Sequence, residues 1–119
     1  MAKRENLVRL TRFKVGEKRR QLDQLEMMMS EFERMASELD TQIASEEKRA
    51  GIYDTAHFAY PTFAKAAQVR RDNLMHSVRE LRERLNVARL ELEEAEAEHV
   101  NAEKLELRDQ GQDERRVSA

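Results

Sequence analysis

The side chains of this sequence best suited to chemistry are a histidine and two glutamates near its C-terminal end. Glu96, His99 and Glu103 are spaced by three and four residues. On a helix this spacing places them on one face, where an imidazole and two carboxylates could hold a divalent metal ion. The other histidines, His57 and His76, lie far from this group in the sequence. We favour the simpler interpretation, in which His99 is a polar residue of a helix seam beside solvated carboxylates.

No common catalytic motif accompanies these residues. The sequence has no glycine-rich phosphate loop, no Gly-x-Ser-x-Gly and no His-Glu-x-x-His. Two paired helices, which the sequence predicts, enclose no cavity large enough to exclude water from a substrate. We therefore expect a protein that is not an enzyme and that has no catalytic residue, metal site or cofactor.

Two heptad repeats predict the elements that carry these side chains. In the first half, apolar residues recur every seven positions at Val8, Val15, Leu22, Met29, Ala36, Ile43 and Ala50, with Leu25, Phe32 and Leu39 at the companion position. In the second half, the two ladders are Ala64, Val78, Leu85 and Leu92, and Ala67, Leu74, Leu81, Ala88, Ala95 and Ala102. Such a repeat keeps one narrow apolar stripe facing a partner helix, as in a coiled coil.

Glycine and proline mark the ends of these helices. Gly51 directly follows the last ladder position of the first half, and glycine commonly ends a helix. Pro61 suits the first turn of the second helix, because its missing amide hydrogen would have no helical partner there. Asp54 is a candidate cap for a short helical piece between them. The predicted segments are a helix over about 3–50, a turn over about 51–60, a helix over about 61–108 and a flexible tail over 109–119, with 1–108 as a single coiled-coil domain.

The short connection and the charge pattern both predict antiparallel helices. A turn of about ten residues joins only neighbouring ends of two long helices. Residues 1–20 are strongly basic and residues 91–106 are strongly acidic. Folding the hairpin lays these opposite charges side by side, whereas parallel pairing of identical chains would set like charges together. The predicted fold class is therefore all-α, a monomeric antiparallel coiled-coil hairpin of two long helices.

The register of this hairpin is predicted by placing large residues opposite small ones. The preferred register contains the pairs Met29–Ala88, Leu22–Ala95, Val15–Ala102, Ala36–Leu81 and Glu46–Arg71. The alternative, slipped by one heptad, sets Arg4 beside Glu106. We prefer the first register because it also neutralises two charges that fall in the seam.

Apolar residues outside the seam are the first candidates for binding other proteins. Leu10 and Phe13 fall on the outer face of the basic helix end, together with Arg9 and Arg12. Exposed aromatic residues commonly anchor protein interfaces. The alternatives are isolated surface apolar residues or a second coiled-coil seam. Further outward apolar positions are Met27, Val87 and Leu90.

Aromatic residues in and beside the turn form the second candidate surface. Four of the six aromatic residues lie there, at Tyr53, Phe58, Tyr60 and Phe63. These rings either contact a partner or cap the end of the hairpin core. The sequence leaves these two interpretations open.

Composition excludes several other classes of protein. The net charge is −2, and the acidic helix lies beside the basic one, so we expect no nucleic-acid partner. The absence of cysteine fits a reducing compartment. No apolar run approaches the roughly 20 residues that span a bilayer, and the start lacks the apolar stretch of a signal peptide. We therefore expect a cytoplasmic protein.

Five short segments carry a resemblance to a known family. They are Leu-Val-Arg-Leu-Thr-Arg-Phe-Lys-Val-Gly-Glu-Lys-Arg-Arg (7–20), Phe-Glu-Arg-Met-Ala-Ser-Glu-Leu-Asp (32–40), Glu-Glu-Lys-Arg-Ala-Gly-Ile-Tyr-Asp (46–54), His-Phe-Ala-Tyr-Pro-Thr-Phe-Ala (57–64) and Arg-Arg-Asp-Asn-Leu (70–74). Together they resemble the alphaproteobacterial branch of the flagellar export protein FliJ family, over about residues 3–108. The turn segment is fairly specific, whereas the heptads would match any coiled coil.

The resemblance implies a cytoplasmic component of the flagellar type III export apparatus, held at the cytoplasmic face of the inner membrane through its partners only. Members of the family form antiparallel coiled coils similar to the two-helix stalk of the rotary ATPase gamma subunit. They engage the flagellar export ATPase, the cytoplasmic domain of the export gate and export chaperones. By this resemblance the ATPase-ring contacts would be Arg9, Leu10, Arg12 and Phe13. The gate or chaperone contacts would be Tyr53, Phe58, Tyr60 and Phe63. The alternative function is a coiled-coil adaptor or scaffold unrelated to secretion.

Overall fold

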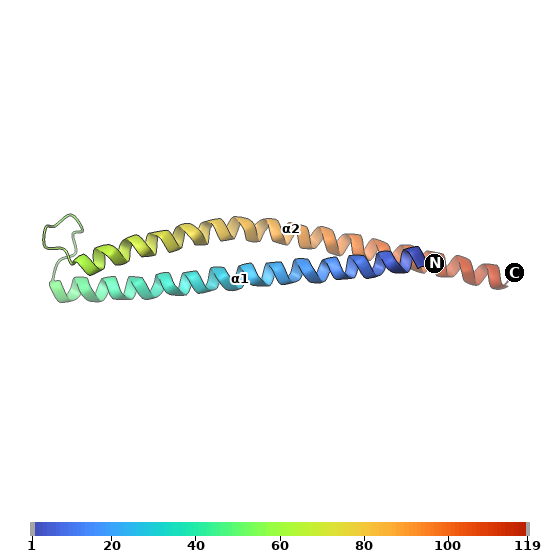
Figure 1. Cartoon of the computed structure of the whole chain (residues 1–119), viewed down its shortest axis with the longest axis horizontal. Coiled ribbons are helices and arrows are strands. Elements are labelled where there is room, and N and C mark those ends of the chain that lie inside the picture. Colours follow the sequence, from blue (N-terminus) through green and yellow to red (C-terminus); the bar gives the residue numbers. More distant parts are fainter. Residues whose placement is uncertain (1, 119) are drawn as a thin grey trace. The chain divides into compact units, whose positions relative to one another are not determined.

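The protein consists of two long helices joined by one turn. The structure, a computed structural model, describes the backbone of residues 2–118 and the side chains of residues 5–116. Helix α1 spans Ala2–Ala50 and helix α2 spans Thr62–Ser118. Figure 1 shows the turn that connects them, and residues 2–118 contain no β-strand. The all-α helical hairpin predicted from the heptads is confirmed.

The contacts between residues of the chain divide it into two compact units, and the heptads do not predict this division. Unit 1 comprises Met1–Gln24 and Leu85–Ala119, and unit 2 comprises Leu25–Arg84. Each unit therefore contains a stretch of α1 and a stretch of α2. The candidate surface around Leu10 belongs to unit 1, and the turn belongs to unit 2.

The seam of unit 1 is built mainly from small apolar residues. Its buried apolar side chains are Val8, Leu85, Ala88, Ala95 and Ala102. Ion pairs flank this seam, with Lys14 Nζ 3.2 Å from Glu98 Oε2 and Lys18 Nζ 2.7 Å from Glu91 Oε2. Residue numbers rise along α1 while those of the partners on α2 fall, so the two helices are antiparallel in this unit.

The core of unit 2 lies next to the turn. Its buried cluster comprises Leu39, Ile43, Tyr60, Ala64 and Ala67, with Ile52 and Leu74 packed against it. Farther along the same seam, Ala36, Val78 and Leu81 are also buried. These are ladder residues of the two heptad repeats plus Ile52 and Tyr60 from the turn. Removing their apolar surface from water is the main force that holds the two helices together.

Gly51 ends α1, as the sequence predicts. Its φ of +71° lies in the left-handed region that glycine adopts without steric cost. The amide groups of Gly51 and Ile52 both donate to the carbonyl of Glu47, at 2.8 and 3.3 Å. These bonds satisfy a carbonyl that would otherwise lack a partner at the helix end.

Two successive tight turns then lead into α2. The Asp54 side chain accepts a hydrogen bond from the Ala56 amide at 2.9 Å, and its carbonyl accepts one from the His57 amide at 3.1 Å. Asp54 thus caps a turn of the kind aspartate favours, and not the short helical piece considered for it. The Tyr60 amide donates to the His57 carbonyl at 3.0 Å and closes the second turn. Pro61 precedes α2 and its carbonyl accepts the Lys65 amide at 3.0 Å, so it occupies the N-cap, one position earlier than predicted.

The predicted end of the second helix is wrong. We expected no helix after residue 108, but α2 continues to Ser118. The lack of an apolar repeat in this segment argues against a seam and does not prevent helix formation. Its glutamine, glutamate and arginine residues favour helix, and Gly111 costs only about 1 kcal/mol. Residue 119 lies outside the described residues.

The preferred register is also wrong, within each unit. In unit 1, Thr11 Oγ1 lies 2.8 Å from His99 Nδ1, a pair that belongs to the register slipped by one heptad. In unit 2, Arg71 Nη1 lies 2.9 Å from Asp40 Oδ1 and does not meet Glu46. Glu46 is instead 3.2 Å from an arginine of its own helix, Arg49. The Arg4 side chain, which the slipped register would set beside Glu106, lies outside the described side chains.

The position of the turn explains the slip. The preferred register would place the first turn of α2 beyond the end of α1, and would leave Ala64 without a neighbouring helix. In the structure, Ala64 and Ala67 are buried against α1, and the helices pair up to the turn. Pairing along the whole available length buries more apolar surface, so it is favoured.

Candidate interaction surfaces

An exposed apolar pair lies among arginines on the outer side of α1, in unit 1. Leu10 and Phe13 each keep 66% of their surface exposed, and Arg9 and Arg12 are exposed beside them. We call these four residues the N-terminal surface. The structure therefore brings together all four residues of the first candidate set and leaves them accessible.

The N-terminal surface continues into a shallow groove that sequence reasoning missed. Arg9, Arg12, Phe13, Gly16 and Arg20 line it. Arg9, Phe13, Gly16 and Arg20 follow each other at intervals of four, three and four residues, which places them in one stripe along the helix. The sequence contains this spacing, but Gly16 has no side chain and therefore gives no apolar or charged signal in the pattern.

Ion pairs divide the basic residues of unit 1 into two groups. Three cations reach across to acidic residues of α2, whereas Arg9 and Arg12 have no ion-pair partner among the described side chains. Arg20 pairs with Glu17 of its own helix. The pairs across the seam are Lys14–Glu98, Lys18–Glu91 and Arg19–Glu96, with N···O distances of 3.2, 2.7 and 3.8 Å. The acidic helix therefore compensates the flanks of α1, and positive charge remains on its outer side.

The aromatic residues of the turn have two different roles. Tyr53, Phe58 and Phe63 are exposed, and Phe58 keeps 96% of its surface accessible. The Phe58 ring stacks on His57 with 4.7 Å between ring centroids. We call Tyr53, Phe58 and Phe63 the turn surface. Tyr60, also predicted as a partner-binding residue, is only 7% exposed and lies in the core, which removes it from the candidate site.

Hydrogen bonds explain why a tyrosine occupies this core position. The Tyr60 hydroxyl donates to Glu47 Oε2 and accepts from Gln68 Nε2, both at 2.9 Å. Its ring fills the end of the apolar cluster while its hydroxyl reaches the polar edge. Burial, and then the hydrogen bond to the Glu47 carboxylate, raise the pKa of the Tyr60 phenol.

The raised pKa of Tyr60 predicts a loss of stability at alkaline pH. A raised pKa means that folding favours the protonated phenol, so its contribution is complete below about pH 10, the ordinary tyrosine pKa, and is lost as the pH rises through the higher pKa of the folded state. We expect the unfolding temperature of the native protein to exceed that of Tyr60→Phe below this range, and the difference to shrink above it. Thermal unfolding followed by circular dichroism measures both.

Tyr53→Phe is the matched control, because Tyr53 is mostly exposed and its hydroxyl has no hydrogen-bond partner among the described residues. Its unfolding temperature should follow that of the native protein at every pH. Parallel curves for the native protein and Tyr60→Phe up to about pH 11.5 would contradict the assignment of the alkaline loss to the Tyr60 phenol.

His99 belongs to the seam of unit 1. Its Nε2 lies 2.9 Å from Glu103 Oε1, and its Nδ1 lies 2.8 Å from the hydroxyl of buried Thr11. The Thr11 hydroxyl also donates to the carbonyl oxygens of Leu7 and Val8, at 2.9 and 3.0 Å. Glu96, the third member of the candidate metal group, is turned to Arg19. Among the described residues no three His, Cys, Asp or Glu side chains are arranged to hold a metal ion.

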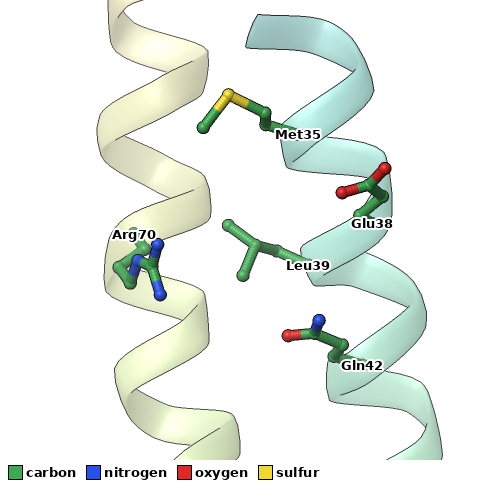
Figure 2. A pocket seen from close by; sticks show the side chains of 5 residues that line it. All are labelled: Met35, Glu38, Leu39, Gln42 and Arg70. Carbon is green, nitrogen blue, oxygen red and sulfur yellow. The ribbon is translucent and has the colours of Figure 1, made fainter.

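A second depression lies between the helices of unit 2. Figure 2 shows Met35, Leu39 and Gln42 of α1 extending toward α2, which contributes Arg70. The cavity measures about 140 Å³ and is lined by these residues and Glu38. Binding sites for small molecules are usually about 300–1,000 Å³ and enclosed by apolar walls. This depression is too small and too open to hold a substrate away from water.

Comparison with protein-family models, curated proteins and solved structures finds no significant match to this chain. Neither helix, over the residues that the structure describes, has an apolar stretch long enough to cross a membrane.

Proposed function

We propose that this chain is a non-enzymatic coiled-coil component of the flagellar type III protein export apparatus. It binds the export ATPase ring and the cytoplasmic domain of the export gate, and acts as a stalk-like coupling protein or escort chaperone. The observation that carries the proposal is the N-terminal surface, where exposed Leu10 and Phe13 lie among uncompensated arginines. The choice of partners rests on the resemblance of the sequence segments to the FliJ family.

The chemistry of such a role is binding alone. A helical hairpin without a catalytic group changes the behaviour of an ATPase ring only if it binds one conformation of the ring more tightly than another. Leu10 and Phe13 supply apolar anchors for this contact, and Arg9 and Arg12 supply charge that steers the approach of an acidic partner. Through these contacts the protein is held at the cytoplasmic face of the inner membrane.

The turn surface serves the second partner, the export gate or an export chaperone. Phe58 is held on two hydrogen-bonded turns, so little conformational entropy is lost when it enters a partner's pocket. Tyr53, in the turn, and Phe63, in the first turn of α2, add further exposed aromatic area. Aromatic side chains on a rigid support are typical interface anchors.

A coiled-coil adaptor unrelated to secretion is the second candidate. It is favoured by Val87 and Leu90, which are exposed on the outer side of α2 in unit 1. These residues could form the seam of a dimer. Light scattering of the purified protein separates the two candidates, because a stable dimer at micromolar concentration supports the adaptor and a monomer supports the export component.

Co-purification with the flagellar export ATPase tests the main proposal. The double variant Leu10→Asp, Phe13→Asp should lose most of its ATPase binding, because two apolar anchors are replaced by charges that an acidic partner repels. Binding to the isolated cytoplasmic domain of the gate should be unchanged. The measurement is the fraction of ATPase retained by each immobilised variant at equal load.

Leu90→Asp is the matched control, since Leu90 is 60% exposed in the same unit but lies on α2. It should retain ATPase as the native protein does. If the double variant keeps full helicity and retains as much ATPase as the native protein, the proposed contact is wrong.

A further inference from the structure

The groove-lining stripe on the outer side of α1 combines positive charge, apolar surface and a position without a side chain. Arg9 and Arg20 lie near its ends, and Phe13 and Gly16 lie between them. Glu98, Glu91 and Glu96 of α2 pair with Lys14, Lys18 and Arg19, whereas Arg9 and Arg12 have no ion-pair partner among the described side chains. The positive charge of this stripe is therefore available to a ligand from outside the hairpin.

Gly16 gives the stripe its shape. A glycine inside a helix costs roughly 1 kcal/mol relative to alanine, so a packing reason is expected for it. The atoms nearest to a Cβ at this position would be those of the Arg20 guanidinium, at 3.6 to 3.9 Å, which is ordinary van der Waals contact. No close contact among the described residues therefore requires a glycine here. The flexible Arg20 side chain covers the space that the missing side chain leaves, so another backbone can approach α1 closely when Arg20 moves aside.

We propose that this stripe is the docking site for an acidic amphipathic helix of a partner protein. Apolar side chains of that helix pack on Phe13 and Leu10, and its backbone approaches α1 at Gly16. Its carboxylates pair with Arg9 and Arg12, arginine being well suited to carboxylate recognition because its guanidinium donates two parallel hydrogen bonds. The inference rests on the proposed function only in that both use this surface for a partner. It does not require that the partner be an export ATPase.

Apolar complementarity distinguishes this ligand from a nucleic acid. A phosphate backbone would contact the arginines but would leave Leu10 exposed to water. It would also gain no contact from the missing side chain at Gly16. A helix uses all of these features, because its own apolar stripe has the same spacing of three and four residues as the stripe on α1.

A pair of synthetic peptides tests the proposal with the full chain. The first, of about 20 residues, carries leucines at helical spacing among glutamates, and the second has lysines in place of the glutamates. Fluorescence anisotropy of the labelled peptides measures their affinity. We expect the acidic peptide to bind and the lysine peptide not to bind. Arg9→Gln with Arg12→Gln should weaken the acidic peptide roughly tenfold, the sum of two modest charge contacts.

Two further variants separate docking from general charge. Gly16→Leu fills the gap and should also weaken the acidic peptide roughly tenfold, while helix content stays the same or rises. Arg19→Gln removes a cation that is paired with α2, and should change the affinity less than about twofold. Circular dichroism of each variant confirms that the helices are intact.

Three results would overturn the proposal. The first is that the acidic peptide does not bind the native chain. The second is that Arg19→Gln weakens the affinity for this peptide as much as Arg9→Gln with Arg12→Gln does. The third is a single-stranded oligonucleotide that binds this stripe more tightly than the acidic peptide. If the native chain binds the peptide but not the ATPase, the proposed function is refuted and the docking site is supported. If it binds the ATPase but not the peptide, only the docking site is refuted.

Discussion

Leu85→Ala should destabilise the protein by about 2–4 kcal/mol, the largest effect we expect from a single truncation in the seam. Leu85 is 3% exposed and is the largest buried apolar side chain of unit 1. The truncation removes about three buried carbon atoms and leaves a cavity that the surrounding structure closes only in part. Urea unfolding followed by circular dichroism measures the change in the free energy of unfolding.

Leu90→Ala is the matched control, because it is the same substitution on the same helix and in the same unit. Leu90 is 60% exposed, and leucine and alanine are both strong helix formers, so we expect a change within about 0.5 kcal/mol. Equal destabilisation by the two variants would mean that Leu90 is buried in solution, for example in a dimer, and would contradict the monomeric hairpin.

Gly51→Ala should destabilise the protein by about 1–2 kcal/mol through the backbone alone. The φ of Gly51 is +71°, and a Cβ placed there would have no atom within 4 Å. The cost therefore comes from the left-handed conformation, which an L-residue adopts with difficulty, and not from a clash. Gly51→Asn should cost less, because asparagine tolerates this region better than alanine. Thermal and urea unfolding measure both changes.

The same substitution should have the opposite sign inside the helix. Gly16→Ala replaces a glycine with helical φ, and its Cβ would make only ordinary contacts with the flexible Arg20 side chain. We expect it to stabilise the protein by about 0.5–1 kcal/mol. A gain at both glycines would show that residue 51 does not hold a left-handed conformation in solution.

Register shows where sequence reasoning reached its limit. The alanines at 88, 95 and 102 repeat every seven residues, so a slip of one heptad still places an alanine opposite Leu22 and Val15, although Met29 then faces Leu81. Matching large residues to small ones therefore does not separate the two registers clearly. The charge pair Glu46–Arg71 then decided in favour of the wrong register. Arg71 has another carboxylate within reach, Asp40, and no pattern in the sequence ranks the two carboxylates.

The candidate surfaces were predictable to different degrees. Leu10 and Phe13 lie outside the heptad stripe, and a residue outside the stripe of a two-helix hairpin has no place to be buried. Their exposure therefore follows from the repeat. Tyr60 lies in the turn, outside any repeat, where periodicity says nothing about the direction of a side chain. Its burial depends on how Asp54 and His57 fold the turn back onto the end of α1.

The sequence by itself determined the two helices, their antiparallel pairing and the end of α1 at Gly51, because these depend on local periodicity, on the length of one connection and on the conformational freedom of one glycine. The extension of α2 to Ser118 follows from the helix propensity of these residues, but the heptad pattern does not predict it. Only the tertiary structure decided the register, the burial of Tyr60 and the separation of the arginines of unit 1 into compensated and uncompensated groups. Each of these depends on which residues far apart in the sequence meet, and a repeat of seven leaves that choice open until the turn closes.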